Sequence, residues 1–404
     1  MRRKGWWMVL AMGWVAVGGA AEPDLGPLVR GNTAFALDLY AQLRTQGGNL
    51  FLSPHSISSA LAMTYAGARE NTAAEMEKAL HFTEGQAGTP PAFAALQARL
   101  AEIEKKGHLQ LAVANSLWPQ QDYPFLPDYL DGVKAAYGSV IAPQDFKSDA
   151  EGARRTINRW VEEKTRDKIQ DLIAPGGLDP LTRLVLVNAI YFKGSWASPF
   201  DPAQTEEGAF WVSPAAEVRV PLMAKMQRLP YAEFEDVQVA QLPYAGGELS
   251  MLVVLPREKD GLAALEARLA PERLAEWRAG LAEREVRVFL PKFKLTWGAV
   301  KLNEALKALG MVDAFSDTQA DFSGMDGQLR WLYIGAVLHK AFVEVNEEGT
   351  EAAAATAVVM RMRAMRPATP PEFRADHPFL FLIQEEETGA ILFMGRVADP
   401  TKAE

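Results

Sequence analysis

The sequence predicts an α+β protein built around large mixed β-sheets. Segments with helical apolar spacing are concentrated in the first half of the chain, whereas apolar and alternating strand-like runs dominate the second half. The two kinds of segment do not alternate in repeating βαβ units, as a doubly wound fold would require. Neither an internal repeat nor a linker rich in Pro or Gly divides the chain, so the 404 residues are expected to form one large domain.

Eight helices follow from apolar spacing and from capping residues. Ser53-Pro54 is expected to begin the second helix, because serine is a good N-cap and proline suits a first turn. Nearly all residues of that helix are apolar or small, so it should be central and buried. Thr72 and Glu75 have the spacing of a capping box, which predicts a helix start at Thr72. In chain order, the expected helices cover residues 25–43, 54–66, from 72 onward, 90–106, 127–137, 150–167, 262–281 and 300–309.

The strand predictions rest on alternation and on uninterrupted apolar runs. Residues 109–118 alternate apolar and polar side chains, which is typical of a half-buried strand. Residues 181–192 form a long, mainly apolar run, so both faces of that strand should be covered. The run 379–397 predicts a hairpin that turns at Glu387-Thr388-Gly389. The expected strands cover residues 49–52, 109–118, 181–192, 231–256, 285–294, 329–345 and 379–397.

Composition excludes several classes of function. The chain is 49% hydrophobic and 23% charged with a net charge of −9, which argues against nucleic acid and against anionic membranes as partners. It has no cysteine, so disulfides, thiolate metal sites and lipidated cysteines are impossible. No nucleophile elbow, zinc-protease motif, P-loop or dinucleotide fingerprint occurs, and no histidine has a metal-ligand neighbour at the required spacing. We therefore expect no enzyme, no metal and no cofactor.

Residues 1–21 have the pattern of a signal peptide. A basic start, Arg2-Arg3-Lys4, precedes an apolar run and the small residues Gly19-Ala20-Ala21. Residues 22–404 would then form the mature domain, in a secreted or extracytoplasmic location such as a periplasm, a cell surface or the medium. An uncleaved anchor is the alternative. The absence of cysteine and the presence of only eight asparagines suit a hot habitat. A prokaryotic source is also expected.

The segment from Glu347 to Arg374 is compatible with two conformations. Its Ala, Glu, Met and Arg residues favour helices, so an ordinary surface helix over residues 347–365 is one interpretation. As a strand, the same segment has one uncharged face, and Glu351, Arg361 and Arg363 lie on the other. The uncharged face comprises Thr350, Ala352, Ala354, Thr356, Val358, Met360 and Met362. Such a strand can enter a sheet with its charges in water, so the segment is suited to a switch.

The same segment opens with residues 346–356, Asn-Glu-Glu-Gly-Thr-Glu-Ala-Ala-Ala-Ala-Thr, which resemble the hinge of inhibitory serpins. Further motifs occur in family order from about residue 25 to 400. They are residues 49–57, 186–196, 290–293, 321–324, 339–341, 377–381 and 393–397. The resemblance implies a single serpin domain with three β-sheets, a large central sheet A, eight or nine helices, and an exposed reactive-centre loop of about residues 347–374.

The resemblance also implies a mechanism and the residues that take part in it. A serine protease would cleave the loop and form an acyl-enzyme, and the cleaved loop 349–363 would insert into sheet A before water releases the protease. The implied hinge is Glu347, Gly349, Thr350, Glu351, Ala352, Ala353, Ala354, Ala355 and Thr356. The implied shutter, a polar cluster beneath the opening of sheet A, is Ser53, Ser56, Asn188 and His339. The implied breach, at the top of the sheet, is Trp196 and Lys292 with Glu347. The alternative for the shutter is that its residues are ordinary buried polar groups of the core. The alternative for Lys292 and Glu347 is a surface ion pair that contributes little to stability.

The spacing from hinge to scissile bond in the family implies cleavage between Arg363 and Ala364, with Arg361 as second choice. Arginine before the bond implies a trypsin-like protease as the partner. Arg366 is a poor site because Pro367 follows it. The helix at residues 90–106 lacks the basic cluster of heparin-binding members, so neither heparin nor another polyanion is expected to bind, and the chain is expected to be a monomer. The rival interpretations are a non-inhibitory serpin acting as carrier, chaperone or storage protein, and a structural protein with an inert helix.

Overall fold

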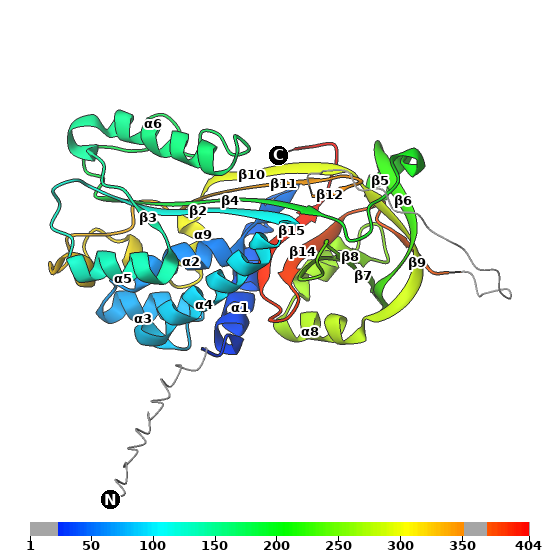
Figure 1. Cartoon of the computed structure of the whole chain (residues 1–404), viewed down its shortest axis with the longest axis horizontal. Coiled ribbons are helices and arrows are strands. Elements are labelled where there is room, and N and C mark those ends of the chain that lie inside the picture. The colour runs from blue at the N-terminus through cyan, green and yellow to red at the C-terminus, as the bar shows by residue number, and fades with distance from the viewer. Residues whose placement is uncertain (1–22, 351–369, 404) are drawn as a thin grey trace, which may run out of the picture.

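The computed structural model describes residues 23–350 and 370–403, which form two β-sheets with helices around them (Figure 1). The described α-helices are α1 (Gly26–Leu43), α2 (Pro54–Tyr65), α3 (Glu70–Ala79), α4 (Gly85–Lys105), α5 (Pro127–Tyr137), α6 (Phe146–Lys164), α7 (Leu262–Ala267), α8 (Pro271–Gly280), α9 (Asn303–Ala308) and α10 (Ser323–Asp326). The described strands are β1 (Leu50–Leu52), β2 (Leu109–Pro119), β3 (Val140–Ile141), β4 (Leu184–Ser195), β5 (Glu206–Ser213), β6 (Ala216–Glu233), β7 (Val237–Pro243), β8 (Leu249–Pro256), β9 (Ala282–Pro291), β10 (Phe293–Lys301), β11 (Leu338–Val345), β12 (Gly349–Thr350), β13 (Glu372–Arg374), β14 (Phe379–Glu385) and β15 (Ile391–Val397). The predicted α+β class is confirmed.

The six-stranded sheet, which we call sheet A, has the order β10-β11-β12-β4-β2-β3. Its central strand β4 is antiparallel to β2 and parallel to β11, with direct pairing from Val187↔Leu338 to Tyr191↔Phe342. Helix α6 lies alone on one face, and α2 lies among the helices on the other (Figure 1). Both faces of β4 are therefore covered, as the uninterrupted apolar run predicted.

Alternate residues of β4 belong to two different cores. Leu186, Ile190 and Phe192 belong to the main core. Val187 and Tyr191 belong to a smaller cluster that includes residues of α6. A strand inserted beside β4 would meet the same two environments, because opposite residues of neighbouring strands share a face.

The nine-stranded sheet runs β1-β15-β14-β8-β7-β6-β9-β13, with β5 attached to β6. The long strand β6 pairs with β5 near its start, with β9 in its middle and with β7 at its end. Two of the three sheets expected from the sequence are thus joined through β6 into one continuous hydrogen-bonded sheet. The chain passes from this sheet to sheet A at Lys292, the single residue between β9 and β10.

Several predicted boundaries are wrong for identifiable reasons. Helix α3 begins at Glu70, so Thr72 does not cap it and instead accepts the backbone N–H of Asp321 through its buried hydroxyl (2.9 Å). Helix α4 begins at Gly85 and contains Pro90 and Pro91. Its early first turn is held by the Gln86 amide, which donates to the carbonyl of Ala68 (2.7 Å).

Three other predicted elements were too long or started too early. The helix expected over residues 262–281 is broken into α7 and α8, because residues 268–270 leave the helical conformation before Pro271. The helix expected from residue 300 starts only at Asn303, because β10 continues to Lys301. The strand expected from residue 329 starts at Leu338, and the preceding residues form a turn and an irregular segment outside any sheet. Strand β5 and residues 216–230 of β6 were not predicted.

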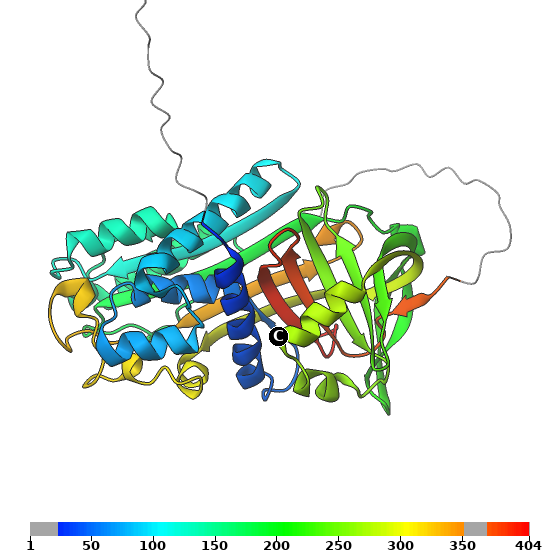
Figure 2. The same cartoon turned by 90° about the horizontal axis from the view of Figure 1, so that it is seen from below.

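The two ends of the molecule carry different elements of the fold. Strand β13 lies at one end, to the right in Figure 1, and β12 lies on the same side of the centre. The connections around α9 and the loop between α6 and β4 lie at the opposite end in both views (Figures 1 and 2).

Candidate functional site

The candidate site begins where the chain reverses direction after β11 and enters sheet A. Asn346 and Gly349 form the turn, with Asn346 N–H bonded to the Gly349 carbonyl at 2.9 Å. The next residues form β12, which pairs with β11 through Val345↔Thr350 and with β4 through Thr350↔Gly194 and Gly349↔Ser195. The first two residues of the predicted insertion segment therefore already occupy a position between the two central strands.

Gly349 and Thr350 meet different steric limits in this position. Gly349 has φ +151°, and a Cβ on it would overlap the carbonyl oxygen of Gly194. Only glycine allows this close approach of two backbones. Thr350 is fully buried, and its hydroxyl lies 2.9 Å from the Tyr244 hydroxyl. Burial raises the pKa of Tyr244 well above its usual value, so the phenol stays neutral and able to share this hydrogen bond.

The predicted breach residues come together around Glu347. Its carboxylate lies 2.9 Å from the Lys292 ammonium and accepts a hydrogen bond from the Thr205 hydroxyl at 2.8 Å. Burial alone would raise the pKa of Glu347, but the hydrogen bonds from Lys292, its own backbone and Thr205 outweigh burial and lower it. The Glu347 side chain is only 11% exposed, so Lys292 and Glu347 form a partly buried ion pair and not a fully exposed surface pair.

Trp196 fixes the backbone of the same turn. Its indole N–H donates to the Asn346 carbonyl at 3.0 Å, and its backbone N–H donates to Glu348 at 2.8 Å. Its ring stacks on Tyr244 with a centroid distance of 4.7 Å and an interplanar angle of 9°. Trp196 therefore connects the reversal turn to the residue that contacts Thr350.

We expect Lys292→Met to destabilise this region, because Glu347 would keep its charge without its ammonium partner. The free energy of unfolding should fall by about 1–2 kcal/mol, measured by denaturant unfolding at neutral pH. Because the pKa of Glu347 is lower in the folded state, its contribution is present above the unfolded pKa near 4.5 and is lost as the pH falls through the folded value.

The matched control for Lys292→Met is Lys105→Met, which breaks an exposed ion pair with Glu102 at 2.5 Å. Both partners of that pair are about two-thirds exposed, so no resolvable change is expected. Equal effects of the two variants would show that the breach pair has no special role in stability.

The predicted shutter residues form one hydrogen-bonded row across sheet A. Asn188 of β4 lies opposite Asn115 of β2 on one side and His339 of β11 on the other. Its amide donates to the Asn115 side-chain oxygen (2.7 Å) and to the Ser56 hydroxyl, and its oxygen lies 2.6 Å from His339 Nδ1. Ser53 completes the row by donating its backbone N–H to His339 Nε2 at 3.2 Å.

These contacts fix the protonation state of His339. Nε2 accepts a hydrogen bond from a backbone N–H, so the proton must lie on Nδ1, where it is donated to Asn188. A second proton on Nε2 would point at the N–H of Ser53. Complete burial lowers the pKa of His339 to about 3, in agreement with this geometry.

Acidification should therefore weaken the closed sheet. The pKa of His339 is about 3 in the folded state and 6.5 when unfolded, so the unfolded chain binds more protons between these values. Stability is fully present above about pH 6.5 and falls as the pH decreases through this window, by about 1.4 kcal/mol per pH unit for each such histidine. Burial lowers the pKa of His55 to about 4, so His55 is a second group that takes up a proton when the chain unfolds below about pH 6.5.

Urea unfolding midpoints at about pH 7.5 and about pH 5 test this prediction. His339→Gln should remove about half of the pH dependence, because it removes one of the two histidines whose pKa burial lowers. His108→Gln, at an exposed position, should leave it unchanged. An unchanged pH dependence in His339→Gln would contradict the assignment of a neutral His339.

The structure adds residues that the sequence did not single out. Asn115, Thr205 and Tyr244 hold Asn188, Glu347 and Thr350 respectively. Asn115 could have been singled out from the sequence, because it is a polar residue at an apolar position of an alternating strand. The predicted hinge residues Glu351, Ala352, Ala353, Ala354, Ala355 and Thr356 and the predicted reactive-bond residues Arg361, Arg363 and Ala364 lie outside the described residues.

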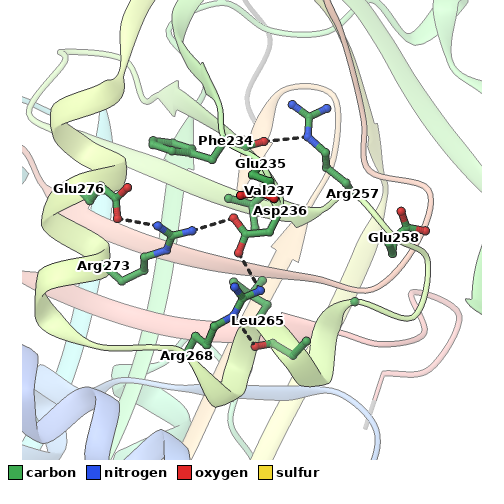
Figure 3. Close-up of a pocket in the computed structure, with 12 residues that line it drawn as sticks. Phe234, Glu235, Asp236, Val237, Arg257, Glu258, Leu265, Arg268, Arg273 and Glu276 are labelled. Carbon is green, nitrogen blue, oxygen red and sulfur yellow. Dashed lines mark hydrogen bonds and ion pairs between the residues drawn. The ribbon is translucent and has the colours of Figure 1, made fainter.

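An open cleft of about 820 Å³ lies away from these residues, between the β6–β7 turn, α7 and α8. Figure 3 shows Asp236 between the guanidinium groups of Arg268 and Arg273, at 2.9 and 2.7 Å. Arg273 also pairs with Glu276 at 2.6 Å. The charges at the centre of the cleft therefore satisfy one another. Within residues 23–350 and 370–403, no group of three metal-ligand side chains is placed to hold a metal, and no helix is long and apolar enough to cross a membrane.

Comparison with known proteins places this site in a family. The family model described as serpin, serine protease inhibitor, matches residues 30–400. The chain belongs to the serpin family. Human leukocyte elastase inhibitor is 43% identical over 380 residues, covering 91% of this chain and 98% of that protein. Serpin B6 of Pongo abelii is 44% identical over 379 residues, covering 92% and 99%. The solved structure of uncleaved ovalbumin has a TM-score of 0.82 at 33% identity, covering 93% of this serpin and all of that chain.

These relatives correct two expectations. The secreted or extracytoplasmic location is wrong, because leukocyte elastase inhibitor and serpin B6 are intracellular serpins without secretion signals. The prokaryotic source is not supported, because similar relatives include proteins of Homo sapiens and Mus musculus. Residues 1–21 lie outside the described part of the chain, so the signal peptide stays an untested prediction.

The comparison also bears on the expectation that this protein is not an enzyme. The sequence argued against an enzyme only from missing catalytic motifs. The matching family model is described as a serine protease inhibitor, and the human relative at 43% identity is named leukocyte elastase inhibitor. This description replaces the argument from missing motifs.

Proposed function

We propose that this serpin is a suicide-substrate inhibitor of trypsin-like serine proteases, with residues 22–404 as one domain and residues 347–374 as its reactive-centre loop. The observation that carries the proposal is β12, because Gly349 and Thr350 already lie between β11 and β4. A cleaved loop that continues from Thr350 would extend this strand through the centre of sheet A.

The register of β12 defines where each loop residue would go. Thr356 lies six residues beyond Thr350, and six residues before Gly194 and Val345 are Asn188 and His339. The two neighbouring strands therefore give the same position, which supports a single register. Thr356 would enter the shutter row and replace the contact between Asn188 and His339 with its own hydroxyl.

The same register gives each face of the inserted strand a suitable environment. Thr350 faces the main core, so every second residue after it would face Phe192, Ile190 and Leu186 of β4. Those core-facing residues are Ala352, Ala354, Thr356, Val358, Met360 and Met362. Ala353, Ala355 and Ala357 would lie on the side that α6 covers. Burial of this face could supply on the order of ten kcal/mol at about 25 cal/mol per Å².

The chemistry uses the protease's own nucleophile. Its serine hydroxyl attacks the carbonyl carbon of Arg363, the bond to the nitrogen of Ala364 breaks, and Arg363 is left as an ester of that serine. Insertion from Thr350 to Arg363 covers thirteen residues, or about 43 Å at about 3.3 Å per residue. The attached protease would then lie that distance along the sheet from Thr350, and the ester would persist if deformation of the protease prevents water from attacking it.

An elastase-type target is the second candidate, because a relative at 43% identity is named leukocyte elastase inhibitor. Elastases have small primary pockets, so cleavage would follow an apolar residue such as Val358 or Met362 rather than an arginine. A non-inhibitory serpin, acting as carrier, chaperone or storage protein, is the remaining alternative. Such a protein would be cleaved without trapping the protease.

Association rates with trypsin and with elastase, together with the first residue of the released C-terminal fragment, distinguish these targets. We expect faster trapping of trypsin and a fragment that starts at Ala364. Faster trapping of elastase, with a fragment that starts after an apolar residue, would replace the trypsin-like assignment. Cleavage by both proteases with neither trapped would support the carrier or storage alternative.

A further inference from the structure

Lys225 is a half-buried lysine whose amino group is bound only by uncharged oxygen atoms. It lies on β6 opposite Val288 of β9. Its Nζ donates to the Ser198 hydroxyl at 2.6 Å and to the Pro199 carbonyl at 2.5 Å. Within residues 23–350 and 370–403, no carboxylate forms an ion pair with it. Ser198 is exposed, so water and small solutes can reach Nζ.

Other described lysines have surroundings that stabilise the charged form or leave it in water. Lys259 and Lys294 lie over aromatic rings, which attract a cation. Lys164 is exposed at the end of α6. Lys225 differs from these because it is partly buried and has no opposite charge beside it. The lysines that pair with carboxylates are Lys105, Lys106, Lys292, Lys307 and Lys402.

The geometry around Nζ suits a neutral amine. An ammonium group has three N–H donors, but Ser198 and Pro199 supply the two acceptors described for Lys225. A neutral amine has two N–H donors and a lone pair, so it can bind both oxygens and keep the lone pair free to react. Burial also lowers the pKa of Lys225, which increases the share of neutral amine at neutral pH. The neutral amine is the nucleophilic form of a lysine.

The two hydrogen bonds of Lys225 connect the two sheets. Residues 196–200 follow β4 of sheet A, whereas Lys225 belongs to β6 of the nine-stranded sheet. The N–H of Phe200 donates to the carbonyl of Glu347 at 2.7 Å, so the same segment supports the turn that precedes β12. Lys225 therefore holds in place a segment on which this turn rests.

We propose that Lys225 is a modification site, where a small carbonyl electrophile such as isocyanic acid adds to the amine and releases residues 198–200 from β6. The Nζ lone pair attacks the carbon of isocyanic acid and forms a C–N bond. The electron pair of the C=N bond takes up the proton that Nζ loses, so no group leaves and the product is a neutral urea. Its Nζ keeps a single N–H, so either Ser198 or Pro199 loses its donor. This inference does not require a trapped protease.

Limited treatment of the full-length protein with cyanate at about pH 7.5, which supplies isocyanic acid, tests the reactivity. Peptide mapping by mass spectrometry, after digestion at acidic residues, locates the modified lysines and separates them from the α-amino group. Lys225 should react at least about tenfold faster than Lys164. The fast reaction should vanish in Lys225→Arg and persist in Lys164→Arg. Equal rates at Lys225 and Lys164, or a fast reaction at another lysine, would overturn the proposal.

Hydrogen exchange with mass spectrometry tests the release of the segment. Peptides that cover residues 196–201 should exchange about tenfold faster after modification of Lys225, because a hydrogen bond to the segment is lost. Lys225→Met, which removes both hydrogen bonds, should show at least the same increase, and the control Lys164→Met should not. Unchanged exchange in the modified protein and in Lys225→Met would show that Lys225 does not hold the segment, and the proposed release would be wrong.

Discussion

Thr350→Arg should convert this serpin from an inhibitor into a substrate. Thr350 is fully buried between β11 and β4, with its hydroxyl 2.9 Å from that of Tyr244. A guanidinium at this position has no carboxylate partner among the contacts described for Thr350, and burying an unpaired charge costs several kcal/mol. This cost would keep residue 350 out of the sheet before cleavage and would have to be met when the loop inserts afterwards. Insertion would slow while hydrolysis of the ester continues, so the yield of trapped protease should fall by about 100-fold, at about 1.4 kcal/mol per factor of ten.

The yield is measured as the number of serpin molecules consumed for each protease molecule trapped. Thr350→Ser is the matched control, because it keeps a small side chain and the hydroxyl that contacts Tyr244. The control should trap protease nearly as well as the original chain. Trapping at full yield by Thr350→Arg would show that residue 350 does not have to stay buried, and the insertion register would be wrong.

Arg363→Leu should lower the rate of trypsin trapping by about a thousandfold or more. A trypsin-like pocket carries an acid that pairs with the guanidinium of the substrate, and leucine would leave that buried acid without a partner. Chymotrypsin-like proteases, which have an apolar pocket, should be trapped faster by the variant than by the original chain. Second-order rate constants for both proteases measure the change.

Arg361→Leu is the matched control for the reactive bond, because it removes an arginine two residues away. This variant should change trypsin trapping only slightly if the bond follows Arg363. A large loss in Arg361→Leu with no loss in Arg363→Leu would place the bond after Arg361. Little change in either variant, with elastase trapped well, would favour the elastase-type target.

The parts of the fold that follow local rules could be predicted from the sequence. Helix α5 has the predicted bounds because Pro127 suits its first turn and Gly138 ends it in a left-handed conformation. The apolar run that became β4 predicted coverage on both faces, although the strand itself begins three residues later, at Leu184. These features depend on residues that are close in sequence, so periodicity and capping are sufficient to find them.

The errors arise where distant residues decide the structure. Thr72 and Glu75 have capping-box spacing, but they bind backbone groups of Asp321 and Val312, which are more than 200 residues away. The shutter and breach residues were named from the family resemblance. Their geometry still required the structure, because Asn115, Thr205 and Tyr244 reach them from other strands and loops. The switch segment could be identified as ambiguous between helix and strand, but only the pairing of β12 gave its register.

Denaturing gel electrophoresis with intact-mass analysis, after mixing the protein with trypsin at equal molarity, tests the central claim most directly. The account predicts a covalent species that contains trypsin and the chain up to Arg363, together with a free C-terminal fragment that starts at Ala364. A cleaved chain beside fully active trypsin would contradict it, because the loop would then be cut without inserting fast enough to hold the ester.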